Sequence, residues 1–274
     1  MRGEGHIGKG RYEVRGEVKK MAVEFVGGEE EAELLILAID SSGTMTINDV
    51  HGGKRRADVI KELAEGLVDR LSKTEKARRY RISTVYFSES VEAEPYKLLH
   101  EVKIRHPLDE VFPEIRDPHK RLTCIACALE KANEILDDFN KGEGLPDRKY
   151  ATIFLFTDGR ENVKEKIDVK NAARKVRRHD IKPTIATIAL GTKEEVDPEL
   201  LWEISSECNE RQKRHMVHAK VLRYVEESNS RVRQNEELKL FLWARDVHEA
   251  EITERFVEAM RQFVYVLSET RVRG

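Results

Sequence analysis

The sequence predicts an α/β fold built on a doubly wound, largely parallel sheet with helices on both faces. The first observation is a pair of short, continuous apolar segments, 34–39 and 151–156, which polar turn residues follow. Such segments are typical of parallel strands that are buried on both sides. The second observation is that segments with an apolar stripe at helical spacing, as at 56–72, alternate with the strands along the chain. This alternation favours a parallel sheet between two helical layers.

The remaining elements are predicted in order from the N-terminus. Partial alternation of apolar residues within 1–31 indicates a strand or hairpin before the main sheet. Strands are predicted at 34–39, 80–87, 91–95, 151–157, 183–190 and 238–244, of which 91–95 is a short antiparallel edge strand. Helices are predicted at 56–72, 123–141, 164–178, 198–207 and 252–267. Prolines between residues 96 and 120 predict loops with a short helix there.

Oxygen-bearing side chains stand where two of the strands end. Asp40, Ser42 and Thr44 occupy alternate positions after the first strand, so a carboxylate and two hydroxyls leave one short loop together. Asp158 ends another strand, and Thr123 lies at the head of a helix. Because ligands of parallel α/β sheets bind beyond the carboxyl ends of the strands, these five side chains are predicted to converge. Hard oxygen ligands in so sparse a set favour Mg²⁺ over Ca²⁺.

The same residues carry a resemblance to a known family. Asp-x-Ser-x-Thr at 40–44, a later Thr at 123 and Thr-Asp-Gly at 157–159 resemble the metal-ion-dependent adhesion site of the von Willebrand factor A (vWA) family. The resemblance covers about Glu33 to Leu267, and Thr44 stands where many members have a second Ser. It implies a Rossmann-like vWA fold of the intracellular prokaryotic type.

The resemblance also implies a function and a division of roles within the site. It implies that Ser42, Thr44 and Thr123 lie closest to a Mg²⁺ or Mn²⁺ ion and that Asp40 and Asp158 act mainly through water. The open position of the ion would take an Asp or Glu of a partner protein. The implied function is a protein–protein interaction module that is not an enzyme and that works in a multi-protein complex, for example with an AAA-type ATPase.

Composition places limits on the compartment and on the class of partner. Charged residues make up 36% of the chain, yet the formal net charge is −2, so the total favours neither a nucleic-acid-binding protein nor an acidic tail. We expect a cytoplasmic protein, because the sequence has no signal-peptide pattern and no apolar segment near the ~18 residues of a membrane span. The three cysteines fit a reducing compartment, and Cys124 and Cys127 are interpreted as small buried side chains rather than a redox or zinc pair.

The predicted organisation is one large domain with additions. Residues 1–31 form an N-terminal extension, 32–268 the vWA domain, and 269–274 a C-terminal tail. A basic segment at 211–237 is predicted to be a helical, exposed insertion before the last strand. In a less favoured alternative, His215 to Ala219 is the last strand. His215 and His218 also have the spacing of zinc ligands, although no acidic or Cys partner stands nearby.

Two other functions compete with the interaction module. Asp-Ser-Ser-Gly-Thr at 40–44 resembles the Asp-x-Asp-Gly-Thr loop of haloacid-dehalogenase-like phosphatases, but Ser42 stands where that family has its acid/base and is a poor proton donor near neutral pH. Nucleic-acid binding through the basic segment 211–237 is the other alternative. Charge alone would support only non-specific contacts there.

Overall fold

The computed structural model describes residues 31–48, 50, 53–112, 121–158, 160–163, 168–234, 236–244 and 250–270. The strand or hairpin predicted for 1–31 lies outside them, except for Glu31 at the start of the first strand. Residues 271–274 of the predicted tail and Gly159 of the Thr-Asp-Gly motif also lie outside them.

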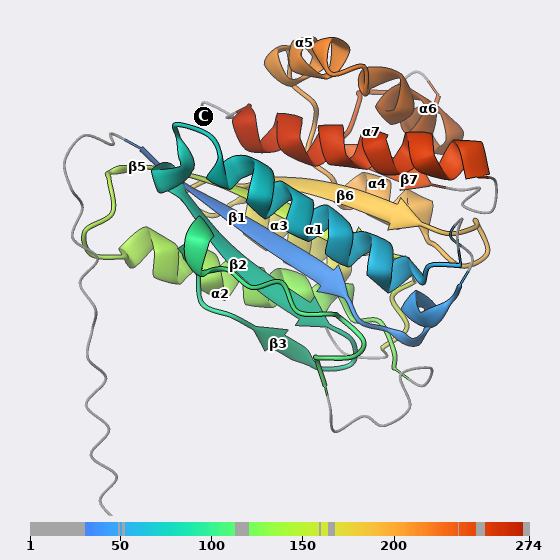
Figure 1. Cartoon of the computed structure of the whole chain (residues 1–274), viewed down its shortest axis with the longest axis horizontal. Helices are drawn as coiled ribbons and strands as arrows, with labels where there is room; N and C mark the ends of the chain where they lie inside the picture. Colours follow the sequence, from blue (N-terminus) through green and yellow to red (C-terminus); the bar gives the residue numbers. More distant parts are fainter. Residues whose placement is uncertain are drawn as a thin grey trace, which may run out of the picture.

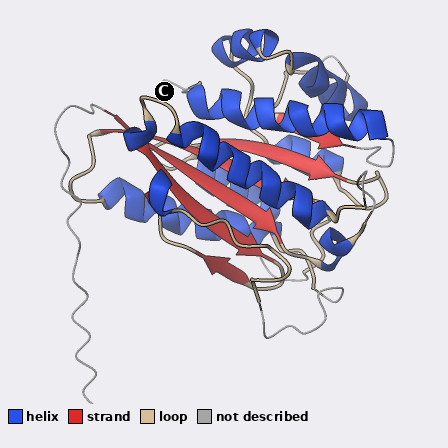
Figure 2. Ribbon diagram, viewed as in Figure 1, coloured by secondary structure: helices blue, strands red, loops and turns tan. Residues whose placement is uncertain are grey.

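The strands form one mixed sheet that is parallel at its centre (Figure 2). Its strands are β1 (Glu31–Asp40), β2 (Tyr80–Phe87), β3 (Val91–Ala93), β4 (Lys97–Leu98), β5 (Arg148–Thr157), β6 (Thr184–Leu190) and β7 (Phe241–Ala244). The order is β3-β2-β1-β5-β6-β7, and β4 pairs with β2 beside this path. The pairs β2-β1, β1-β5, β5-β6 and β6-β7 are parallel, whereas β3 and β4 are antiparallel to β2. The predicted fold class is confirmed, and β4 adds a second short antiparallel strand.

Helices cover both faces of the sheet, with α1 and α7 on one face and α2, α3 and α4 on the other (Figure 1). The helices are α1 (Arg56–Ser72), α2 (Ile125–Lys141), α3 (Val169–Arg177), α4 (Pro198–Ile204), α5 (Glu210–His218), α6 (Leu222–Val232) and α7 (Ala250–Glu269). Short 3₁₀ helices are η1 (Gly43–Thr46), η2 (Ala77–Arg79) and η3 (Leu99–Glu101). None of the described helices combines the length and the apolar character that crossing a bilayer requires.

Strand β1 lies at the centre of the sheet, and this position explains why its sequence is continuously apolar. Successive side chains of a strand point to opposite faces. Accordingly, Leu35, Leu37 and Ile39 pack in the core beneath α1 and α7. Leu34 and Ile36 pack in the second core, with α2. Both faces of β1 are therefore apolar. Asp40 is the last residue of this strand, and its backbone is held by pairing with β2 on one side and β5 on the other.

Two predicted helices are shorter than expected, for local reasons. Helix α3 begins at Val169 instead of residue 164, because the side chain of Asp168 caps it by accepting a hydrogen bond from Lys170 N. Helix α4 ends at Ile204 instead of residue 207. There Ser206 turns to the sheet, where its N–H donates to Ile185 O and its hydroxyl accepts from Ile185 N. Capping residues and tertiary hydrogen bonds thus override the apolar periodicity at these ends.

Helices α5 and α6 lie within the segment 211–237 that was predicted to be a helical insertion, but one face of these helices is buried. Met216 and Val225 are fully buried in the core beneath α7, which corrects the expectation that the segment is exposed. The cause is that α5 packs on α7 and α6 packs on β7 (Figure 1). The alternative with a last strand at His215 to Ala219 is wrong, because α5 occupies those residues to His218 and β7 pairs with β6.

The cysteines depart from the prediction. Cys124 and Cys127 form a disulfide, with Cα atoms 5.3 Å apart, so their interpretation as separate small side chains is wrong. The physical reason is that one helical turn brings residues three apart onto the same side, within the Cα separation that disulfides require. Cys208 is a free, buried thiol.

Candidate metal centre

The predicted metal ligands come from chain segments that meet at one edge of the sheet. Asp40 is the last residue of β1, and Asp158 directly follows β5, which pairs with β1 in parallel. After β1 the chain continues to β2 on one side, whereas β5 lies on the other side. The two carboxylates therefore stand at the point where the winding of the sheet reverses, which is the place where α/β sheets bind ligands.

Asp40 is fully buried, and its two oxygens are fixed by different elements. Oδ1 accepts a hydrogen bond from Ser42 N at 2.7 Å, which shapes the turn after β1. Oδ2 accepts from Thr157 Oγ1 at 2.6 Å, across the strand pair. In the sequence, Thr157 stands out only as part of the Thr-Asp-Gly motif, which does not predict this role. Its position beside Asp158, on the strand next to Asp40, is the signal that would have identified it.

The loop after β1 brings Ser42, Thr44 and Asp158 together. Ser42 Oγ lies 3.2 Å from Thr44 Oγ1, and Thr44 Oγ1 donates to Asp158 Oδ1 at 2.7 Å. Thr44 reaches Asp158 from the short helix η1, for which Ser42 is the N-terminal flanking residue. The same loop is held against the start of α2 because Gly43 N donates to Arg121 O at 3.0 Å.

Thr123 is held at the start of α2 by the loop that follows β5. Its N–H donates to Asn162 Oδ1 at 2.7 Å, and Asn162 N donates to Thr123 O at 3.1 Å. The side chain is buried, and its hydroxyl makes no hydrogen bond to any other residue in the described part of the chain. The structure thus brings Thr123 next to the metal loop without a hydrogen bond from its side chain to the other four residues, which leaves the hydroxyl available to a ligand.

Arg56 is a charged neighbour that sequence reasoning missed. This first residue of α1 is buried, with 1% of its surface exposed, and its guanidinium bridges Asp158 Oδ2 at 3.1 Å and Glu195 Oε2 at 2.9 Å. Gly191, at φ +116°, makes room for the pair, since a Cβ there would lie 2.9 Å from Arg56 Nη1. A basic residue in the first turn is unfavourable to the helix dipole, and this was the available signal.

Electrostatics at the site favour a bound cation. Burial raises the pKa of Asp40, and burial together with the negative charge of Asp40 raises the pKa of Asp158. Arg56 opposes the second shift but supplies only one positive charge, which it shares with Glu195. A divalent ion would offset the remaining repulsion between the carboxylates, and three hydroxyl oxygens stand on the segments around them. The residues present therefore fit a hard divalent cation.

No other grouping of side chains among the described residues competes as a metal site. Among the described residues, no three His, Cys, Asp or Glu side chains are arranged so that they could hold a metal ion, and the zinc alternative at His215 and His218 therefore finds no third ligand there. The candidate site consists of two carboxylates, Asp40 and Asp158, and the hydroxyls of Ser42, Thr44 and Thr123.

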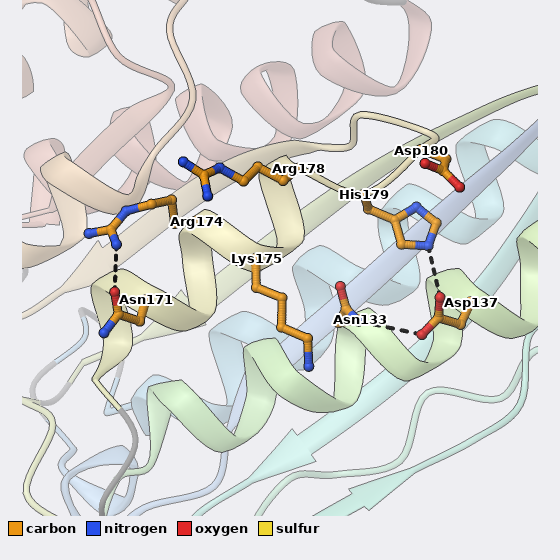
Figure 3. A pocket seen from close by; sticks show the side chains of 8 residues that line it. All are labelled: Asn133, Asp137, Asn171, Arg174, Lys175, Arg178, His179 and Asp180. Carbon is orange, nitrogen blue, oxygen red and sulfur yellow. Dashed lines mark hydrogen bonds and ion pairs between the residues drawn. The ribbon is translucent and has the colours of Figure 1, made fainter.

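A separate pocket of about 560 Å³ lies between α2 and α3 (Figure 3). Positively and negatively charged side chains line this pocket. Asp137 from α2 contacts His179 Nε2 at 3.3 Å and Asn133 at 3.5 Å. None of the five candidate ligands lines it. The pocket and the metal site are therefore distinct.

Comparisons with known proteins agree with this geometry. The family model described as "von Willebrand factor type A domain" matches residues 35–230. The crystal structure of proximal thread matrix protein 1 from the mussel byssus is similar at 16% identity and a TM-score of 0.50, and covers 84% of this chain and 47% of that one. The chain thus spans less than half of that structure. Comparison with curated proteins finds no match.

Two further solved structures carry metals according to their descriptions. A second form of the mussel protein, with a "zinc occupied MIDAS motif", shares 16% identity at a TM-score of 0.48 and covers 83% of this chain and 47% of that chain. Manganese-loaded TRAP protein of Plasmodium vivax shares 15% identity at 0.45 and covers 83% of this chain and 74% of that chain. By its family-model match over most of its length, this chain belongs to the von Willebrand factor type A domain family.

Proposed function

We propose that this chain is a metal-dependent protein-binding module. Asp40, Ser42, Thr44, Thr123 and Asp158 would hold Mg²⁺ or Mn²⁺, and the ion would take a carboxylate from a partner protein. The observation that carries the proposal is the meeting of two fully buried carboxylates and the hydroxyl of Thr44 at the reversal point of the sheet. The match to the von Willebrand factor type A domain family, whose metal-ion-dependent adhesion site these residues resemble, also supports a divalent ion here.

The chemistry of the ligands favours an anionic partner group. Three of the five ligands are neutral hydroxyls, so a bound ion would keep much of its positive charge. An incoming Asp or Glu gains a charge-assisted bond, whereas Asn or Gln of the same shape must displace water without that gain. The residues of the chain supply the positions of the oxygens. The metal would supply the charge that attracts the partner.

An exposed apolar residue stands beside the proposed metal ligands. Leu122 precedes Thr123 and has 43% of its surface exposed, which makes it one of two large apolar residues that the structure describes as exposed. Its position is fixed because its N–H donates to Glu89 Oε2 at 2.9 Å. An apolar contact next to a polar anchor is a common arrangement at protein interfaces. Leu122 is therefore the first candidate for a second point of contact with the partner.

The metal ligands can be tested by replacing Thr123 with Val. The hydroxyl of Thr123 makes no hydrogen bond within the described residues, so this near-isosteric change should leave the metal-free fold intact. Binding of an ion to the native state alone adds about 2.7 kcal/mol when the ion is at a hundredfold its dissociation constant. We expect the melting temperature of the natural protein to rise with Mg²⁺ and that of Thr123→Val to rise much less.

Thr184→Val is the matched control for this test. Thr184 is also a buried threonine, but it begins β6 and so lies at the end of the strand away from the site. The Mg²⁺ response of the control should equal that of the natural protein. An equal response in Thr123→Val would place the ion elsewhere.

The proposed setting is a cytoplasmic multi-protein complex, and an AAA-type ATPase is the first partner class to test. This step depends on the resemblance to intracellular prokaryotic members alone. Affinity capture with and without Mg²⁺ tests it. Nucleic-acid binding is not proposed, because Lys213 and Arg231 in α5 and α6 pair with Glu210 and Glu227 of the same helices.

A further inference from the structure

The disulfide between Cys124 and Cys127 lies next to the proposed metal ligand Thr123. We propose that this pair is a thiol–disulfide exchange site that reacts with small or protein dithiols, and that its redox state controls the position of Thr123. The second half of the proposal rests on the metal-binding function proposed above. The first half does not depend on a metal.

The two cysteine residues differ in their exposure to solvent. Cys124 is buried, with 1% of its surface exposed, whereas Cys127 is partly exposed. An attacking thiolate must reach a sulfur along the S–S bond, so access decides which sulfur is attacked. We infer that the attack falls on Cys127 Sγ and that Cys124 is the leaving group.

Cys124 is well placed to leave as a thiolate. It is the N-cap residue of α2, and its Sγ accepts a hydrogen bond from Cys127 N at 3.2 Å. The N-terminus of a 17-residue helix also favours negative charge on the departing sulfur. Both effects stabilise the sulfur that departs. The buried position of Cys124 and its hydrogen bond thus favour the same direction of exchange.

The exchange balances in two steps. A thiolate of an external dithiol attacks Cys127 Sγ, a mixed disulfide forms, the Cys124–Cys127 bond breaks, and Cys124 leaves with the electron pair. The second thiolate of the external dithiol then attacks the sulfur of that dithiol in the mixed disulfide. A disulfide forms within the dithiol molecule, and Cys127 leaves as a thiolate. The external dithiol is oxidised by two electrons, and the protein pair is reduced and takes up two protons.

The coupling to the metal site follows from how the first turn of α2 is held. Glu161 Oε2 accepts from Ile125 N at 2.5 Å and from Ala126 N at 3.4 Å, and Asn162 binds the backbone of Thr123. The start of α2 is thus clamped to the loop that follows Asp158. The disulfide closes this turn covalently, directly after Thr123. When it opens, only hydrogen bonds hold the turn, so the Thr123 hydroxyl is less well fixed.

The direction of exchange can be tested with single-cysteine variants. In a Cys208→Ser background, which removes the other thiol, Cys124→Ser leaves only Cys127 and Cys127→Ser leaves only Cys124. Each folded variant is incubated with glutathione disulfide, and the mixed disulfide is followed by mass spectrometry. We expect the Cys127 thiol to react about tenfold faster or more, because glutathione disulfide can approach the partly exposed Cys127 but not the buried Cys124. Equal rates, or faster reaction at Cys124, would overturn the direction.

Reversibility is tested on the Cys208→Ser protein with the pair intact. A phosphine reductant followed by a thiol-alkylating reagent should label both cysteines in the folded protein. Glutathione disulfide should then restore the intramolecular bond in a reduced, unlabelled sample. A disulfide that resists reduction until the protein unfolds would refute an exchange site.

The coupling is tested by Mn²⁺ titration of the oxidised protein and of the reduced, desalted protein. We expect the reduced form to bind Mn²⁺ about tenfold more weakly, as when a group that supports a metal ligand is lost. A Cys124→Ser, Cys127→Ser double variant should match the reduced form. Equal affinities would refute the coupling. If neither form binds Mn²⁺, the proposed metal function fails together with the coupling, while the exchange experiments decide the first half separately.

Discussion

Arg56 places a permanent positive charge against the candidate metal site. Because this arginine is buried and pairs with Asp158 and Glu195, its removal leaves charges uncompensated in the interior. We predict that Arg56→Met destabilises the metal-free protein by about 3–5 kcal/mol, the usual cost of breaking a buried pair. The same variant should gain more stability from Mg²⁺ than the natural protein does, since its site is more negative.

Urea denaturation with and without Mg²⁺ measures both effects. Arg55→Met is the matched control, because Arg55 precedes Arg56, has 31% of its side chain exposed, and pairs with Asp58 and Asp109 instead. Its response to Mg²⁺ should equal that of the natural protein. If Arg56→Met also responds like the natural protein, Arg56 does not set the charge of the site.

Another buried ionisable side chain, Glu33, lies towards the opposite end of β1. Burial raises the pKa of Glu33 from 4.5 to about 8, although Arg79, whose Nη2 lies 3.8 Å from Glu33 Oε2, opposes the shift. Between these two pH values the unfolded state has released the proton that the folded state keeps. Stability therefore falls as pH rises through this window, by about 1.4 kcal/mol per pH unit at its steepest.

Glu33→Gln should remove this dependence, because the amide keeps the shape of the protonated acid. We predict that the variant and the natural protein have similar stability near pH 4.5 and that the variant becomes more stable as the pH approaches 8. Thermal melts across this window measure the difference. Glu226→Gln, at an exposed position of α6, should leave the slope unchanged. A slope that persists in Glu33→Gln would assign it to another group.

At the scale of elements, the side chains of Asn229 and Ser228 join α6 to the sheet. Asn229 accepts hydrogen bonds from Trp202 Nε1 and Lys239 N, both at 2.8 Å, and donates to Lys239 O at 3.1 Å. It thereby links α4, α6 and the segment before β7. We predict that Asn229→Ala lowers the free energy of unfolding by about 1–3 kcal/mol or more, because buried donors lose their partner.

Chemical denaturation of Asn229→Ala measures the effect. Ser230→Ala on the same helix is the control, because Ser230 is exposed and bonds only within α6 in the described structure. The control should change stability little. If Asn229→Ala also changes the free energy of unfolding little, α6 contributes little to the stability of the domain, as expected for an exposed insertion.

The elements that the sequence predicts well are those whose own residues determine them. Helix α1 and strand β2 have the predicted bounds, because the periodic pattern of apolar residues in the sequence starts and stops where these elements do. Helix α4 ends early because of a pairing with β6 that no local pattern reveals. The buried face of α5 and α6 was missed for a similar reason. Their apolar residues have helical spacing, but which surface covers them is decided by α7 and β7.

The same distinction applies to the candidate site, where some features are recognisable from local motifs and others depend on the folded structure. Its five predicted residues are recognisable from a motif spread over three segments, and the structure brings those segments to one edge of the sheet. Arg56 was missed because a long side chain from a neighbouring helix reaches the site only in the folded protein. The disulfide was missed because Cys-x-x-Cys at a helix start is compatible with either free or bonded thiols.

At the scale of the whole molecule, the reversal of the sheet gathers the proposed metal ligands and Leu122 at one rim. We predict that a partner protein binds there through an Asp or Glu, with Leu122 as an apolar second contact. Binding should be lost on chelation of the metal, on Asp40→Ala in this chain, and on replacement of one acidic residue of the partner by its amide. Calorimetry or surface plasmon resonance with an identified partner measures each loss.

Leu122→Ala separates the two contributions. It removes an exposed side chain and leaves the backbone that carries Thr123, so Mg²⁺ should still raise the melting temperature as in the natural protein. Partner affinity should nevertheless fall by about 1–2 kcal/mol, the range for an apolar contact near the centre of an interface. Val217→Ala, at the other exposed apolar residue, lies on α5 and should leave the affinity unchanged. Binding that survives chelation and Leu122→Ala but fails in Val217→Ala would move the interface from this rim to α5.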